Sequence, residues 1–154
     1  MTKSDLLPRI LEILEDQHRV MRHALKESRE NASGDETKSE GKYDTRATEA
    51  AYLAGAQQEQ ADKLADAIHT FRNWRPPHFE LTDEISLGAL VETDLDDETS
   101  FYLLAPAAGG TTLEYLGCEL TLLTPEAPLF QQLVGRKPGD MLDDPPLLLL
   151  LGVE

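Results

Sequence analysis

Two runs of regularly spaced residues limit what this chain can fold into. In both, the spacing follows the alternation of four and three that marks the contact seam of a coiled coil. The first run is Leu7, Leu11, Leu14, His18, Met21, Leu25, Ser28 and Ala32, and the second is Ala47, Ala50, Ala54, Gln57, Ala61, Leu64, Ile68 and Phe71. Two seams of equal length joined by one loop predict an antiparallel helical hairpin.

The ends of the hairpin follow from local signals. Ser4 is the expected cap of the first helix, and Pro8 is expected in its first turn, where a missing N–H costs little. The second helix should stop before Pro76-Pro77, so the first domain is predicted to span residues 1–75. Bulky seam residues at the open end and alanines near the loop predict a hairpin that narrows toward the loop.

Residues 76–154 predict a small second domain rich in β-structure. Strand-like segments lie at 85–92, 100–104, 113–115, 119–123 and 147–153. A short helix is expected to begin near Pro128 and to stop at Gly135. The pair Pro145-Pro146 before the last strand is typical of an edge strand. The predicted fold class is therefore α+β, an antiparallel coiled-coil hairpin followed by a β-rich domain.

Charge and composition exclude several classes of function. The net charge is −15, and residues 81–154 hold 14 acidic residues against the two basic residues Arg136 and Lys137. Such a chain is not expected to bind duplex DNA by itself, because cations must replace the counterions of the phosphates. The single cysteine, Cys118, allows no intramolecular disulfide. No signal peptide is evident and the longest apolar run is too short for a membrane span, so we expect a cytoplasmic protein without membrane contact.

Two motifs carry a resemblance to a known family. The segment TPEAPLFQQLVGRKPGD at 124–140 contains Ala127-Pro128, Gly135-Arg136 and Gly139-Asp140, and the loop after the first helix contains Gly34-Asp35, Ser39-Glu40 and Tyr43. In this order they resemble the bacterial GreA/GreB transcript cleavage factors, over roughly residues 5–140. The resemblance implies an N-terminal coiled coil and an FKBP-like C-terminal domain at 76–154 that docks on RNA polymerase.

The resemblance also implies a function and its residues. In that family, the coiled-coil tip enters the secondary channel of RNA polymerase and stimulates the Mg-dependent cleavage of backtracked nascent RNA. Here the tip loop is 33–46, and Asp35 (or its neighbour Glu36) and Glu40 map onto the two catalytic acids. Asp35, Glu36, Glu40 and Asp44 are the candidate Mg²⁺ ligands, only in complex with the polymerase. The chain would then be a monomeric accessory factor, not an enzyme, with no cofactor of its own and with nascent RNA reached through the polymerase.

The departures from the family pattern keep alternatives open. Extra residues separate Asp35 from Ser39, Gly41 stands where the family has Asn, and the chain diverges after Asp140. One alternative is a non-cleaving regulator or inhibitor of polymerase, of the type of Rnk or the inhibitory Gre homologues. A less favoured one is an FKBP-like peptide-binding module, because few aromatic residues are present to line a peptide pocket. Trp74 is expected to pack at the joint between the hairpin and the second domain.

Overall fold

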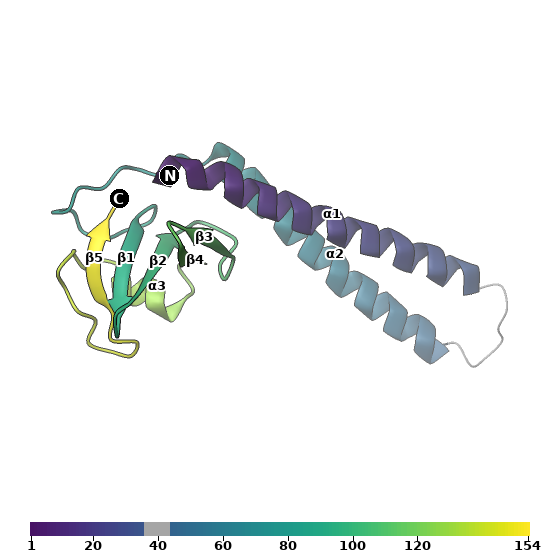
Figure 1. The fold of residues 1–154 in the computed structure, drawn as a ribbon. Coiled ribbons are helices and arrows are strands. Elements are labelled where there is room, and N and C mark those ends of the chain that lie inside the picture. Colours follow the sequence, from purple (N-terminus) through teal and green to yellow (C-terminus); the bar gives the residue numbers. More distant parts are fainter. Residues whose placement is uncertain (36–43) are drawn as a thin grey trace. The chain divides into compact units, whose positions relative to one another are not determined.

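The computed structural model describes residues 1–35 and 44–154, with side chains described for 1–30 and 53–154. Within these residues, two long helices are followed by a five-stranded sheet and one short helix (Figure 1). The predicted α+β class is confirmed. The chain divides into two compact units, Leu11–His69 and a unit made of Met1–Ile10 with Thr70–Glu154. The open ends of both long helices thus group with the sheet.

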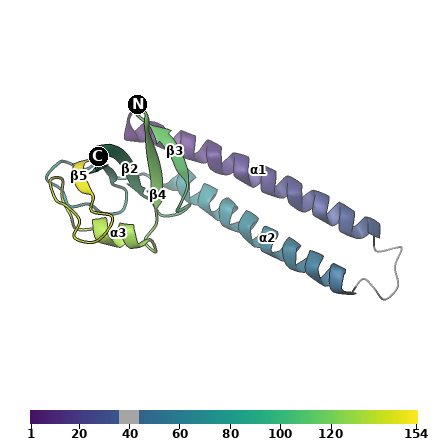
Figure 2. The ribbon, with the colours of Figure 1, turned by 60° about the horizontal axis from the view of Figure 1, so that its bottom comes forward.

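The helices α1 (Lys3–Asp35) and α2 (Asp44–Asn73) form the predicted hairpin. Within Leu11–His69 their ribbons run alongside each other in both views (Figures 1 and 2). Every predicted seam residue with a described side chain is buried or half-buried, with Leu14, Leu25, Ala61 and Ile68 among the buried ones. The phase of both seams is therefore confirmed.

Three details of the hairpin differ from the prediction. The cap of α1 is Thr2 and not Ser4. The Thr2 amide donates to Asp5 Oδ2 at 2.7 Å, and the Thr2 hydroxyl donates to the same oxygen at 3.0 Å. The Asp5 amide in turn donates to the Thr2 carbonyl at 3.0 Å. Pro8 consequently lies in the second turn of α1 and not in the first. The ribbons also do not draw together toward the loop in either view, so the predicted narrowing is not seen (Figures 1 and 2).

The sheet has the order β3-β4-β2-β1-β5. Its strands are β1 (Leu90–Leu95), β2 (Glu98–Leu104), β3 (Thr112–Tyr115), β4 (Cys118–Leu123) and β5 (Leu149–Val153), with α3 (Pro128–Leu133) between β4 and β5. β2 and β4 are parallel, and the other neighbours are antiparallel. β5 lies at the edge, as its preceding prolines predicted.

The strand expected at 85–92 begins only at Leu90. Ile85 instead pairs with the loop after α3, donating its N–H to the Arg136 carbonyl at 2.8 Å and accepting from the Gly135 N–H at 2.9 Å. The apolar character of Ile85 reflects burial in the core and not membership of the sheet. The strand expected at 147–153 likewise begins two residues late, at Leu149.

Apolar side chains are buried on both faces of the sheet. One face carries a cluster that includes α3 and the segment before β1; its members include Phe79, Ile85, Val91, Leu104, Leu123, Phe130, Leu133, Leu142 and Leu150. Alternation along the strands points a second set of buried residues to the opposite face, namely Leu90, Phe101, Leu103, Leu113, Tyr115, Leu120 and Leu122. Phe101 and Tyr115 meet edge to face there, with ring centroids 4.9 Å apart.

The open ends of the helices supply the cover for this second face. Leu6 and Ile10 of α1 and Phe71 of α2 are fully buried and belong to the same compact unit as the sheet. The Lys3 amide donates to the carboxylate of Glu154, just after β5, and Arg9 Nη1 donates to the Glu114 carbonyl of β3 at 2.7 Å. The first turns of α1 therefore cross from one edge strand toward the other.

Candidate functional site

The tip of the hairpin is the candidate site predicted from the sequence. α1 ends at Asp35 and α2 begins at Asp44, so the backbone brings both residues to the closed end of the hairpin. Glu36 and Glu40 lie outside the described residues, as do the side chains of Asp35 and Asp44. With 33 and 30 residues, the two helices are each about 45–50 Å long at about 1.5 Å per residue. The four acids remain predicted functional residues.

The motif at 124–140 has a structural explanation. Pro128 is the first residue of α3, where its fixed φ suits the helix and its missing N–H costs nothing. Phe130 and Leu133 enter the core cluster from this helix. Gly135 then takes a positive φ of 85° after the helix, a conformation that favours glycine. The first part of the motif therefore builds a short helix that closes one face of the sheet.

The second part of the motif holds the edge strand. Gly139, at φ 95°, donates its N–H to the Leu150 carbonyl at 2.7 Å, and the Asp140 carbonyl accepts from the Leu150 N–H at 2.8 Å. The Asp140 carboxylate accepts the Lys137 N–H at 2.9 Å. These contacts assign Gly139 and Asp140 to the scaffold, since their hydrogen-bonding groups are used within the loop and on β5.

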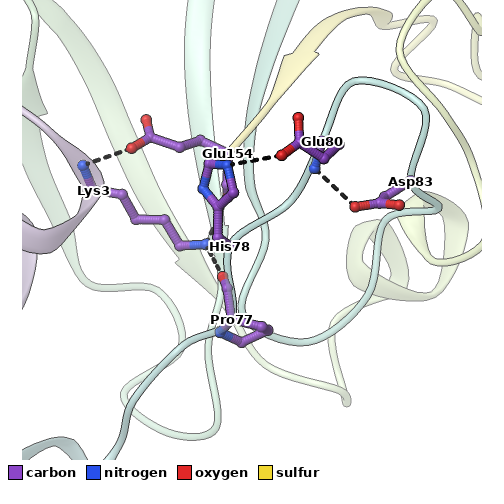
Figure 3. Close-up of polar contacts among 6 residues, drawn as sticks. All are labelled: Lys3, Pro77, His78, Glu80, Asp83 and Glu154. Carbon is purple, nitrogen blue, oxygen red and sulfur yellow. Dashed lines mark hydrogen bonds and ion pairs between the residues drawn. The ribbon is translucent and has the colours of Figure 1, made fainter.

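A buried cation ties the start of α1 to the sheet unit, a feature that the sequence did not predict (Figure 3). Lys3 is only 7% exposed, and its Nζ donates to the carbonyls of Pro77 and Glu154, each at 2.6 Å. The ammonium also lies 5.0 Å from the centre of the Phe79 ring. Burial lowers the pKa of Lys3 from 10.5 to about 8, against the opposing effect of the Glu154 carboxylate. Lys3 joins three segments of one unit and faces no open site.

The surroundings of several other residues in the described chain give no indication of a functional site. His18 is half-buried on the hairpin seam, and His23 lies 3.2 Å from Glu27 on an exposed helix face. Trp74 packs edge to face on Phe71, with centroids 5.6 Å apart, which agrees with a packing role. Among the side chains described for residues 1–30 and 53–154, no group of three or more histidine, cysteine or acidic residues is placed to hold a metal ion. Nor does this part of the chain contain a helix that is both long and apolar enough to cross a bilayer.

The β3–β4 hairpin carries a shallow hollow of about 290 Å³. It is lined by Thr112, Leu113, Glu114, Gly117, Cys118 and Glu119. Cys118 is half-buried beside two exposed carboxylates, and the lining contains no base that could activate the thiol and no cation that could hold a phosphate. The hollow therefore does not compete with the hairpin tip as a candidate site.

Comparisons with known proteins find similarity in solved structures alone. No protein-family model matches the sequence, and no characterised protein matches it. The crystal structure of GreA factor homolog 1 (Gfh1) of Thermus thermophilus is 20% identical over 94% of each chain, with a TM-score of 0.37. Gfh1 of Thermus aquaticus is 20% identical over 93% of this chain and 92% of that one, with a TM-score of 0.36. A third structure, of the transcription factor Gfh1, is 20% identical over 94% and 92%, with a TM-score of 0.37.

These proteins are homologs of GreA, which belongs to the family that the motifs at 34–43 and 124–140 resemble. The matches extend over nearly the whole of each chain. At 20% identity the function of this chain has to be argued from its own residues.

Proposed function

We propose that this protein is a transcription elongation factor that binds RNA polymerase and inserts its hairpin tip into the secondary channel. There it stimulates the polymerase's own Mg-dependent cleavage of backtracked nascent RNA. The chain is thus an accessory factor that acts in the cytoplasm as a monomer. It reaches the RNA 3′ end through the polymerase and has no cofactor of its own.

One observation supports this proposal more strongly than any other observation does. The sequence motif with Asp35 and Glu40 falls between the end of α1 and the start of α2, at the closed end of a two-helix element. A pair of acids in that place can reach an active site that belongs to another protein. The burial of seam residues on both helices, among them Leu14, Leu25 and Ala61, supports a two-helix element of this kind.

The chemistry of the tip residues fits a shared magnesium site. Carboxylate oxygens are the ligands that Mg²⁺ prefers, and Asp35, Glu36, Glu40 and Asp44 would supply them together with ligands of the polymerase. Two Mg²⁺ ions at such a centre would together stabilise the attacking and leaving oxygens of phosphodiester hydrolysis. The role of the chain's own acids is to complete that ligand set and to orient the attacking water through a carboxylate oxygen.

A non-cleaving regulator is the second candidate, and the composition of the tip favours it. Lys38, Lys42 and Arg46 alternate with the acids, and extra residues separate Asp35 from Ser39. Cations that pair with the carboxylates would weaken Mg²⁺ binding while leaving entry into the channel intact. In that case the protein would bind polymerase and slow synthesis without shortening the RNA.

A stalled polymerase complex with labelled, backtracked RNA tests the proposal. The protein is expected to accelerate shortening of the transcript, and the double variant D35A/E40A is expected to lose at least about 100-fold of this acceleration, in the range seen when an essential electrostatic group is removed. Polymerase binding by the variant should stay within about twofold of the wild type.

The matched control removes the same charge from the shaft of the hairpin. Glu12 and Glu59 are exposed on α1 and α2, so E12A/E59A should cleave as the wild type does. Binding without any cleavage by the wild-type protein would favour the non-cleaving regulator. Absence of binding to the polymerase would refute both candidates.

A further inference from the structure

We propose that an apolar strip at the β5 edge of the sheet, formed by Met141, Leu147 and Leu149, docks on a basic protein surface that presents apolar side chains. This inference rests on the proposed function, under which that surface belongs to RNA polymerase. The strip lies in the segment after Asp140, where the chain departs from the GreA/GreB sequence pattern. It is therefore a feature of this chain that the family resemblance does not account for.

The register of the strands places the three residues together. Leu149 of β5 has Asp94 of β1 as its partner on one side and Met141 as its bridge partner on the other. The Leu142 N–H donates to the Leu148 carbonyl at 2.9 Å, and the Leu148 N–H donates to the Pro146 carbonyl at 2.8 Å, so the chain turns tightly at Leu147 next to this pair. Met141 and Leu149 are thus direct neighbours on two adjacent segments, and Leu147 lies two residues before Leu149.

Alternation shows that Met141 and Leu149 point away from the core cluster. Leu142, Leu148 and Leu150 are buried in that cluster. Met141 directly precedes Leu142, Leu149 lies between Leu148 and Leu150, and the two are bridge partners, so the side chains of Met141 and Leu149 lie on the opposite face. On that face the side chains of Leu90 and Leu103 are buried.

The strip itself is open to solvent. Met141 is 55% and Leu147 is 50% exposed, and Leu149 is half-buried. The burial of this face thus stops before the β5 edge. A contiguous apolar patch with a polar rim is typical of a surface that binds another protein.

The charges around the strip determine which partner can cover it. Asp94 is the strand partner of Leu149, and Asp143 and Asp144 lie between Met141 and Leu147 in the sequence, with Asp143 Oδ2 3.0 Å from Arg136 Nη2. Residues 81–154 carry 14 acidic and two basic residues, a net charge of 2 − 14 = −12. A second copy of this chain, a nucleic acid or an anionic membrane would meet like charge here. A surface with lysine or arginine around apolar side chains is complementary both to the acidic residues and to the apolar strip.

Binding to purified RNA polymerase, measured by fluorescence anisotropy of the labelled full-length protein, tests the inference. Leu147→Ser is expected to weaken binding about tenfold, which corresponds to about 1.4 kcal/mol, because the variant removes apolar surface from the interface. Leu81→Ser is the matched control, because Leu81 is 66% exposed and is not part of the strip; its affinity should equal that of the wild type. D94N/D144N should bind more weakly and show a shallower dependence of affinity on salt.

The outcomes separate this inference from the proposed function. Tight binding by the wild type with no change in Leu147→Ser would overturn the strip as a docking surface and leave the proposed function intact. Absence of wild-type binding would refute the proposed function itself. Sedimentation of the free protein is a further check, because a dimer that Leu147→Ser dissociates would assign the strip to a second copy and overturn the basic partner.

Discussion

The hairpin unit (Leu11–His69) and the sheet unit (Met1–Ile10 with Thr70–Glu154) differ in how many large side chains they bury completely. Of the largest fully buried side chains in the described residues, Leu14 is the one that belongs to Leu11–His69. The others belong to the sheet unit with its helix ends, and Leu104, Leu120 and Leu133 are examples with no exposed surface. Stability is therefore concentrated in the unit that we propose to dock on the polymerase. The unit that carries the predicted tip acids is a long element held by a half-buried seam.

This contrast predicts that truncating a core leucine of the sheet unit lowers the free energy of unfolding more than truncating a seam residue of the hairpin. The truncation in the sheet unit is the largest effect that we expect. Leu104→Ala should lower the free energy of unfolding by about 2–5 kcal/mol, because it opens a cavity in a closely packed core. Met21→Ala removes a half-buried seam side chain whose site is partly hydrated, and it should cost about 1 kcal/mol. Urea denaturation of both variants measures the difference. Equal costs would show that the seam is packed as tightly as the sheet core.

Lys3 gives the sheet unit a dependence of stability on pH. Its folded pKa of about 8 lies below the ordinary 10.5, so between these values the unfolded chain binds more protons and stability rises with pH. A neutral amine still donates to both the Pro77 and the Glu154 carbonyl. Urea denaturation of the wild type between pH 8 and about 9.5, below the range in which tyrosines ionise, should show this rise.

Lys3→Met is the reference for that measurement. The variant removes the titrating group and keeps much of the apolar stem, so the difference in unfolding free energy between the two proteins should change with pH in this window. Identical pH slopes for the wild type and Lys3→Met would contradict the assignment of a lowered pKa to the buried ammonium.

The smallest expected effect is a gain of stability in the hairpin. Gln57 lies on the seam, and its buried Oε1 has no hydrogen-bond partner among the residues that the structure describes. Gln57→Leu removes this unpaired acceptor and adds apolar contact, so it should stabilise the hairpin by about 1 kcal/mol. Slower exchange of the α2 amides with deuterium would show it. Faster exchange would mean that Gln57 has a partner that stabilises the seam.

The elements that the sequence predicted correctly are those with a local signal. The seams could be read because helical spacing repeats over eight positions in each run, and Pro145-Pro146 identified the edge strand because proline has no N–H for a neighbouring strand. The prediction of a strand at 85–89 is wrong, because an apolar residue such as Ile85 is needed equally in a buried loop.

Features that depend on distant partners could not be predicted. Lys3 is buried by Pro77 and Glu154, which lie 74 and 151 positions away in the sequence. At the sequence level a lysine before a helix is an ordinary exposed residue. The cap at Thr2 was missed for a smaller reason, since Thr2 and Ser4 are both good cap residues and the Asp5 carboxylate decides between them.

The central claim is that binding and chemistry reside in different parts of this chain. A competition assay tests it most directly: D35A/E40A is added in increasing excess to wild-type protein and a stalled polymerase complex with labelled RNA, and the shortened transcript is measured. We expect cleavage to fall to the level without factor, because the variant binds the polymerase but lacks the tip acids. Unchanged cleavage at a large excess of the variant, or cleavage by the variant alone at the wild-type rate, would contradict the account.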